Sequence, residues 1–133
     1  MEIKYNEATI NRPGGDRILD APFVFSDLEK YTQQLKEEEA WQKNDRNSIT
    51  VFKTRGFTMV LTCLHKDAAI PKNLMDGLLT IQVLDGSIDF EIDTTVTMSK
   101  HQMVTLHPGI EHNITAKEDA VILITNRVIE NNA

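Results

Sequence analysis

The stretch that decides the fold runs Leu78-Leu79-Thr80-Ile81-Gln82-Val83-Leu84-Asp85-Gly86-Ser87-Ile88-Asp89-Phe90-Glu91-Ile92. Apolar and polar residues alternate on both sides of Asp85-Gly86, and a period of two is typical of strands with one buried face. The Asp-Gly pair tolerates the positive φ angles of a tight turn, so the stretch predicts a two-residue β-hairpin. Three apolar pairs are expected across this hairpin: Val83 with Ile88, Ile81 with Phe90, and Leu79 with Ile92.

The same period of two continues through the rest of the chain after Ser48. The expected strands cover residues 49–53, 57–64, 78–84, 87–92, 96–98, 103–106, 112–116 and 120–126. Turn residues separate them, among them Gly56, Pro71 and Pro108-Gly109. Many short, regularly spaced strands with turn residues between them predict an all-β sandwich or barrel.

The N-terminal third has a different pattern. An extended arm is expected over residues 18–25, and a capping box with Ser26 at the N-cap and Glu29 three residues later predicts the start of a helix. Leu28, Tyr31 and Leu35 form the apolar stripe of this helix, and Trp41 is expected to anchor its end against the sheet. We therefore expect residues 1–47 to pack as arm and helix on the sandwich or barrel of residues 48–133, within one structural domain.

Composition limits the function classes. The 133 residues carry a formal net charge of −6 with scattered Lys and Arg, which argues against a nucleic-acid or anionic-membrane surface. No apolar run approaches a membrane span and the first residues lack an apolar leader, so the expected location is cytoplasmic. The single cysteine, Cys63, excludes an internal disulfide and is expected to be a buried, unreactive residue.

Three segments carry a resemblance to a known family: Ile70-Pro71-Lys72-Asn73, the strand ending Val83-Leu84-Asp85-Gly86, and residues 103–112 with the turn His107-Pro108-Gly109. Together they resemble a small single-domain cupin of unassigned activity, over about residues 57–125. The resemblance implies a jelly-roll barrel, or double-stranded β-helix, with the arm and helix at its N-terminus. It is a poor guide to reaction, because this barrel hosts unrelated functions.

The resemblance also implies where a metal would bind. Metal-binding cupins supply two His and a Glu from the first motif and a third His from the second. Carried over to this chain, those positions fall on Asn73, Met75, Leu79 and His112, and only His112 matches. Amide, thioether and alkyl groups are not the imidazole and carboxylate ligands of such metals, so no metal or other cofactor is expected.

His112 is the best single site candidate, because alternation along its strand directs it into the barrel. It is either a buried His satisfied by one hydrogen bond or a group that orients a ligand. The expected ligand-binding residues are His112, Asn73, Met75, Leu79, Ile81, Phe90 and His107. His107 could hydrogen-bond across the barrel mouth, or it could only stabilise its own turn as a polar side chain. His65 and His101 are expected at the surface. No motif identifies catalytic residues.

Three functions remain open. The first is metal-independent binding or sensing of a small molecule in the barrel interior. The second is an oxygenase or isomerase that holds a divalent metal at His112 with histidines from new positions. The third is a structural or regulatory protein that uses an outer sheet face of Thr80, Gln82, Asp89 and Glu91. A homodimer is expected in each case, because Leu84 and the apolar tract of residues 18–25 need cover, and because small cupins often pair.

Overall fold

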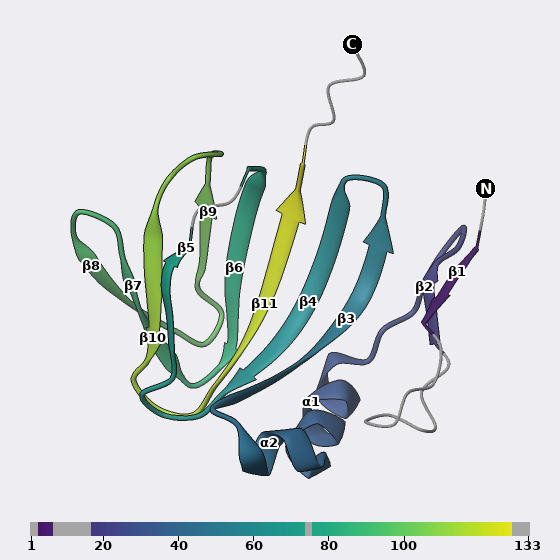
Figure 1. The fold of residues 1–133 in the computed structure, drawn as a ribbon, viewed down its shortest axis with the longest axis horizontal. Coiled ribbons are helices and arrows are strands. Elements are labelled where there is room, and N and C mark those ends of the chain that lie inside the picture. The colour runs from purple at the N-terminus through teal and green to yellow at the C-terminus, as the bar shows by residue number, and fades with distance from the viewer. Residues whose placement is uncertain (1–2, 7–16, 74–75, 129–133) are drawn as a thin grey trace.

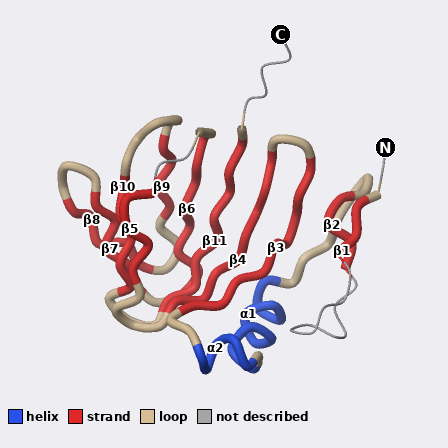
Figure 2. The backbone as a smooth tube through the Cα atoms, viewed as in Figure 1, coloured by secondary structure: helices blue, strands red, loops and turns tan. Residues whose placement is uncertain are grey.

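The computed structural model describes residues 3–6, 17–73 and 76–128 (Figures 1 and 2). Within these ranges the chain forms two helices and eleven strands. The strands are β1 (Lys4–Asn6), β2 (Arg17–Asp20), β3 (Arg46–Thr54), β4 (Phe57–Leu64), β5 (Ala69–Asn73), β6 (Leu78–Asp85), β7 (Ser87–Glu91), β8 (Thr95–Ser99), β9 (Met103–Leu106), β10 (His112–Ala116) and β11 (Ala120–Arg127). The helices are α1 (Leu28–Glu37) and α2 (Glu39–Lys43).

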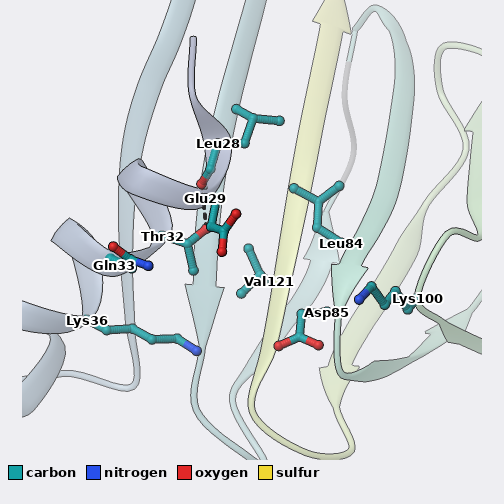
Figure 3. A pocket seen from close by; sticks show the side chains of 9 residues that line it. All are labelled: Leu28, Glu29, Thr32, Gln33, Lys36, Leu84, Asp85, Lys100 and Val121. Atoms are coloured by element: carbon teal, nitrogen blue, oxygen red, sulfur yellow. Dashed lines mark hydrogen bonds between the residues drawn. The ribbon is translucent and has the colours of Figure 1, made fainter.

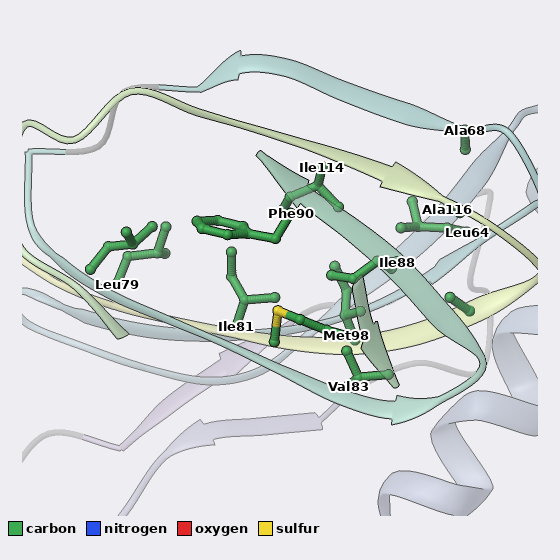
Figure 4. Close-up of a cluster of buried hydrophobic side chains, with 13 residues drawn as sticks. Leu64, Ala68, Leu79, Ile81, Val83, Ile88, Phe90, Met98, Ile114 and Ala116 are labelled. Carbon is green, nitrogen blue, oxygen red and sulfur yellow. The ribbon is translucent and has the colours of Figure 1, made fainter. Parts of the chain in front are cut away.

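Two antiparallel sheets form the barrel. One has the strand order β5-β10-β7-β8, and the other has the order β3-β4-β11-β6-β9. A cluster of buried apolar side chains from both sheets lies between them, including Ile81, Val83, Ile88 and Ile114 (Figure 4). The expected all-β jelly-roll barrel is therefore confirmed.

The predicted hairpin at Asp85-Gly86 is wrong. β6 pairs with β11 and β9, whereas β7 pairs with β10 and β8, so the two strands lie in different sheets. The chain crosses between the sheets at Gly86, which has a φ of +74°, and a Cβ at this position would overlap the carbonyl oxygen of Asp119. Glycine is required because only it combines this backbone conformation with so close an approach.

The alternation in this stretch nevertheless identifies the inner side chains. Leu79, Ile81 and Phe90 are each at most 2% exposed, and Val83 and Ile88 are fully buried. Ile92 is the exception: it lies beyond the end of β7 and is 42% exposed. Leu79 instead lies opposite Leu106 on β9. The hairpin prediction was thus wrong about which strands pair, and it was right about the inward-facing side chains other than Ile92.

The helix covers the outer face of the five-stranded sheet. Leu35 is completely buried there, and Leu28 and Tyr31 pack against the same apolar cluster, as the helical stripe predicts. Trp41, which lies off this stripe, packs against the same cluster as the expected anchor. The predicted cap is wrong by one residue, since the Oδ1 atom of Asp27 accepts the hydrogen bond from the Lys30 N–H at 3.1 Å. The packing of α1 gives this sheet two apolar faces, one in the barrel and one under the helix.

The segment before the helix lies beside the edge strand β3, where the Arg17 guanidinium donates a hydrogen bond of 2.7 Å to the Thr50 carbonyl. After β2 the chain continues to α1 with Phe23 and Phe25 exposed at 85% and 84%. The division of the chain between residues 47 and 48 stays a prediction. No described helix is long and apolar enough to cross a membrane.

Candidate site around His112

His112 opens β10 and lies inside the barrel. Its side chain is only 1% exposed, and Ile114 and Ala116, which follow on the same face of the strand, are also buried. Across the ladder, the backbone of His112 lies opposite Asn73, the last residue of β5. The alternation that predicts an inward His112 is therefore correct.

The hydrogen bonding of this imidazole is incomplete. Its Nδ1 atom lies 3.0 Å from the carbonyl oxygen of Ile110. A carbonyl only accepts, so Nδ1 must carry the hydrogen, and in the neutral ring Nε2 is then an acceptor. Nε2 is buried and has no hydrogen-bond partner among the described residues. An unsatisfied buried polar atom of this kind is uncommon and calls for a physical explanation.

Among the described residues, Phe90 lies next to the imidazole. The centroid of the Phe90 ring lies 5.7 Å from that of His112, with the two planes tilted by 30°. Leu79, Ile81 and Phe90 point toward one another in the barrel interior (Figure 4). The structure thus places His112, Leu79, Ile81 and Phe90 of the predicted set inside the barrel.

The remaining predicted residues are placed differently. His107 is exposed in the loop after β9, so it adds nothing to the buried surface around His112. Asn73 faces His112 in the backbone register, and Met75 lies outside the described residues. Within the described residues, this loop therefore supplies the Ile110 carbonyl to the buried imidazole, and the exposed His107 side chain does not reach it.

The donor set does not fit the metal implied by the fold. Leu79, the position to which the sequence resemblance carries the metal-binding carboxylate, has an alkyl side chain that is buried against other apolar groups. Across the described residues no three His, Cys, Asp or Glu side chains gather closely enough to hold a metal ion. One imidazole with an alkyl group in place of the carboxylate is a poor ligand set for zinc, iron or manganese.

The site around His112 does not include Cys63, His65 or His101. Burial raises the pKa of the Cys63 thiol to about 11, so it stays protonated and is a poor nucleophile near neutral pH. His65 is half-buried rather than at the surface as predicted, with its ring stacked on Trp41 at 3.4 Å and its Nε2 atom 2.7 Å from the Trp41 carbonyl oxygen. His101 is exposed in a turn, as predicted.

The outer face suggested for a protein partner is not one surface. Thr80 and Gln82 lie on β6, whereas Asp89 and Glu91 lie on β7, in the other sheet. A groove of about 550 Å³, lined by both apolar and charged side chains, does lie between α1 and the five-stranded sheet (Figure 3). Lys36 and Lys100 extend into it from opposite sides, but both lysines are exposed, as are the carboxylates of Glu29 and Asp85. Solvent screens such charges strongly.

A second hollow, of about 460 Å³, was missed by the sequence reasoning. It lies between β8 and β9, and we name it the seam pocket. The residues that line it are Phe90, Ile92, Val96, Thr97, Met98, Gln102, Met103 and Val104. Two apolar residues of short strands that line it, Val96 and Met103, are exposed. Their exposed fractions are 51% and 58%.

Comparison with known proteins gives structural matches only. No family model matches the sequence. No curated protein matches it either. A conserved protein of unknown function from Streptococcus pyogenes superposes with a TM-score of 0.66 at 22% identity, covering 84% of this chain and 91% of that one. A cupin superfamily protein from Desulfitobacterium hafniense gives 0.63 at 13% identity, over 65% and 80%.

One match is an enzyme by its description, the polyketide cyclase RemF from Streptomyces resistomycificus, with a TM-score of 0.57 at 12% identity over 66% of this chain and 68% of that one. Unknown function and catalysis thus both occur among structures similar to this chain. At these identities the likeness shows the fold and leaves the activity open. The chain has the cupin fold.

Proposed function

We propose that this protein binds a small, partly apolar molecule in the barrel interior through His112, without a metal. The observation that carries the proposal is the buried Nε2 atom, which lacks a partner among the described residues. Leaving such an atom unsatisfied costs about 1–3 kcal/mol, and a ligand that supplies the missing hydrogen bond recovers this cost.

The Ile110 carbonyl determines which ligands fit. Because Nδ1 donates to it, the neutral ring offers an acceptor at Nε2, and the ligand must bring a hydroxyl or N–H group. The rest of the ligand meets Leu79, Ile81 and Phe90, which provide no polar atoms beyond the backbone. A few placed polar groups within an apolar wall are typical of small-molecule sites. The proposed class is an alcohol, phenol or amide with an apolar body.

A matched pair of probes tests this requirement. Isothermal titration of the purified protein with 1-naphthol and with 1-methoxynaphthalene compares a donor with an ether of similar shape. We expect 1-naphthol to bind about tenfold tighter, which corresponds to about 1.4 kcal/mol, the typical value of one buried hydrogen bond. The His112→Phe variant, which keeps an aromatic ring but removes the acceptor, is expected to lose this preference.

The control is His101→Asn, which changes an exposed histidine in a turn with a φ of +75°, a conformation that Asn tolerates. It should keep the full preference for 1-naphthol. Equal binding of the two probes by the unmodified protein, or an unchanged preference in His112→Phe, would overturn the proposal. Asn73 is proposed as a second hydrogen-bonding residue, so Asn73→Ala should weaken binding of both probes.

The enzyme alternative makes a different prediction. A metal-dependent cupin prepared without a histidine tag should contain close to one transition metal per chain, whereas our proposal predicts none bound in stoichiometric amount. Inductively coupled plasma mass spectrometry distinguishes the two. A stoichiometric metal that is lost in His112→Ala would replace our proposal with the enzyme.

We also propose that two copies associate through the segment before α1. Phe23 and Phe25 expose most of their surface, and apolar side chains exposed so completely at neighbouring positions are typical of contact surfaces. Light scattering should give twice the chain mass of 15.1 kDa, and the double variant Phe23→Ser, Phe25→Ser should give that mass once. A monomer before substitution would contradict this association.

A further inference from the structure

The seam pocket occupies a gap that the topology of the barrel creates. β8 and β9 follow each other along the chain, yet each lies at the edge of a different sheet, so no ladder of hydrogen bonds joins them. The turn between them is fixed at one end, because the His101 N–H donates to the Val83 carbonyl and the Gln102 carbonyl accepts from the Val83 N–H, both at 2.9 Å. The gap is thus a stable feature of the fold, and its volume of about 460 Å³ lies in the range of ligand pockets.

The chemistry of this pocket is that of an apolar binding site. None of the residues that line it carries a charge, although 26% of the chain is charged. Ile92, Val96 and Met103 leave between 42% and 58% of their surface exposed around it. Clustered apolar exposure of this kind marks binding sites, and the flexible thioethers of Met98 and Met103 can adapt to a ligand's shape.

One polar group in the pocket has a fixed orientation. The Oε1 atom of Gln102 accepts a hydrogen bond of 2.8 Å from the Ser99 N–H. This contact directs the amide oxygen to the backbone, and it leaves the NH₂ end of the Gln102 amide as the free donor. This NH₂ group can donate a hydrogen bond to one acceptor atom of a ligand whose body is otherwise apolar.

Phe90 connects this pocket to the site around His112. Its side chain lines the seam pocket, and its ring centroid lies 5.7 Å from that of His112. Phe90 is thus the residue that the seam pocket and the site around His112 share. We propose that the molecule held by His112 is elongated, with its donor group at Nε2 and an apolar chain in the seam pocket. This inference rests on the proposed function and names its ligand class: an amphiphile with a hydroxyl or N–H head.

A pair of phenols that differ only in chain length tests the inference. The ethyl chain of 4-ethylphenol is too short to fill the seam pocket, whereas 4-hexylphenol adds four methylenes. We expect 4-hexylphenol to bind the unmodified protein at least about tenfold tighter, because each buried methylene strengthens binding. Val96→Lys and Met103→Lys should abolish this gain while still binding 4-ethylphenol.

Thr95→Lys is the matched control. It places the same charge on the same edge strand, at an exposed residue that does not line the seam pocket, and Lys is well tolerated on edge strands. It should keep the tenfold gain. Urea unfolding of each variant verifies that the fold is intact before affinities are compared.

The outcomes separate this inference from the proposed function. If both phenols bind equally, or if Val96→Lys keeps the gain, while His112→Phe still weakens both, the seam pocket is excluded and the proposed function stands. If His112→Phe leaves the affinity for 4-hexylphenol unchanged, the shared site and the proposed function are both overturned. If Val96→Lys instead halves the molecular mass measured by light scattering, a second copy covers the pocket and the inference is wrong.

Discussion

Replacing Leu79 with alanine tests how the central stretch is packed. Leu79 is 2% exposed, whereas its neighbour Leu78 is 37% exposed on the same strand, so the pair offers a matched comparison of one residue type in two environments. The substitution removes three carbon atoms, worth about 2.4 kcal/mol of transfer free energy at ~0.8 kcal/mol each. The cavity that remains adds to this, and we expect Leu79→Ala to lower the free energy of unfolding by about 3 kcal/mol.

Leu78→Ala should cost about 1 kcal/mol, because much of that side chain already contacts water. Both substitutions remove the same side chain from the same strand, so the difference between them reports the two environments. Equilibrium urea unfolding, with a shared slope, measures both values. Equal losses, or a larger loss at Leu78, would refute the assignment of Leu79 to the barrel interior. They would also refute the argument that an alkyl side chain stands there where a metal site needs a carboxylate.

Three further predictions concern backbone, cap and thiol. Gly86→Ala should destabilise the protein at least twice as much as Gly109→Ala. Both glycines have a positive φ, but only at Gly86 would an added Cβ overlap a neighbouring backbone. Thermal unfolding measures both effects, and equal effects would contradict the crossing at Gly86. Asp27→Ala should lower the free energy of unfolding by about 1 kcal/mol, whereas Ser26→Ala should leave it almost unchanged. A larger loss in Ser26→Ala would show that Ser26 is the N-cap. Burial raises the pKa of Cys63 from 9.0 to about 11, so the stability that its protonated form contributes is complete below pH 9 and is lost as the pH rises toward 11. The advantage of the unmodified protein over Cys63→Ala in urea unfolding should therefore shrink over that range, and a constant difference would argue against a buried thiol.

Of the inward-facing side chains predicted for the central stretch, all but Ile92 face the core. Alternation with a period of two reports burial directly, and it correctly places Leu79, Ile81, Phe90 and His112 inside the barrel. The β9 and β10 bounds also match the predicted ranges. These features depend on local chemistry, so a single sequence contains them.

Strand pairing was the part that could not be predicted reliably. Asp85-Gly86 fits a hairpin turn and equally a corner at which the chain changes sheets, and the choice depends on β10 and β11, which approach Gly86 from far along the sequence. β5 was missed because Pro71 interrupts its pattern in a strand at the edge of its sheet, where a missing N–H is tolerated. The seam pocket follows from the same non-local topology.

The protonation of the His112 ring tests the central claim most directly. Long-range ¹H–¹⁵N correlation spectra of protein labelled with ¹⁵N-histidine distinguish a ring nitrogen that carries hydrogen from one that does not. Our account predicts hydrogen on Nδ1, a bare Nε2, and a shift of the Nε2 signal when 1-naphthol is added but not when 1-methoxynaphthalene is added. A hydrogen on Nε2 in the neutral ring, or an Nε2 signal that neither compound moves, would contradict it.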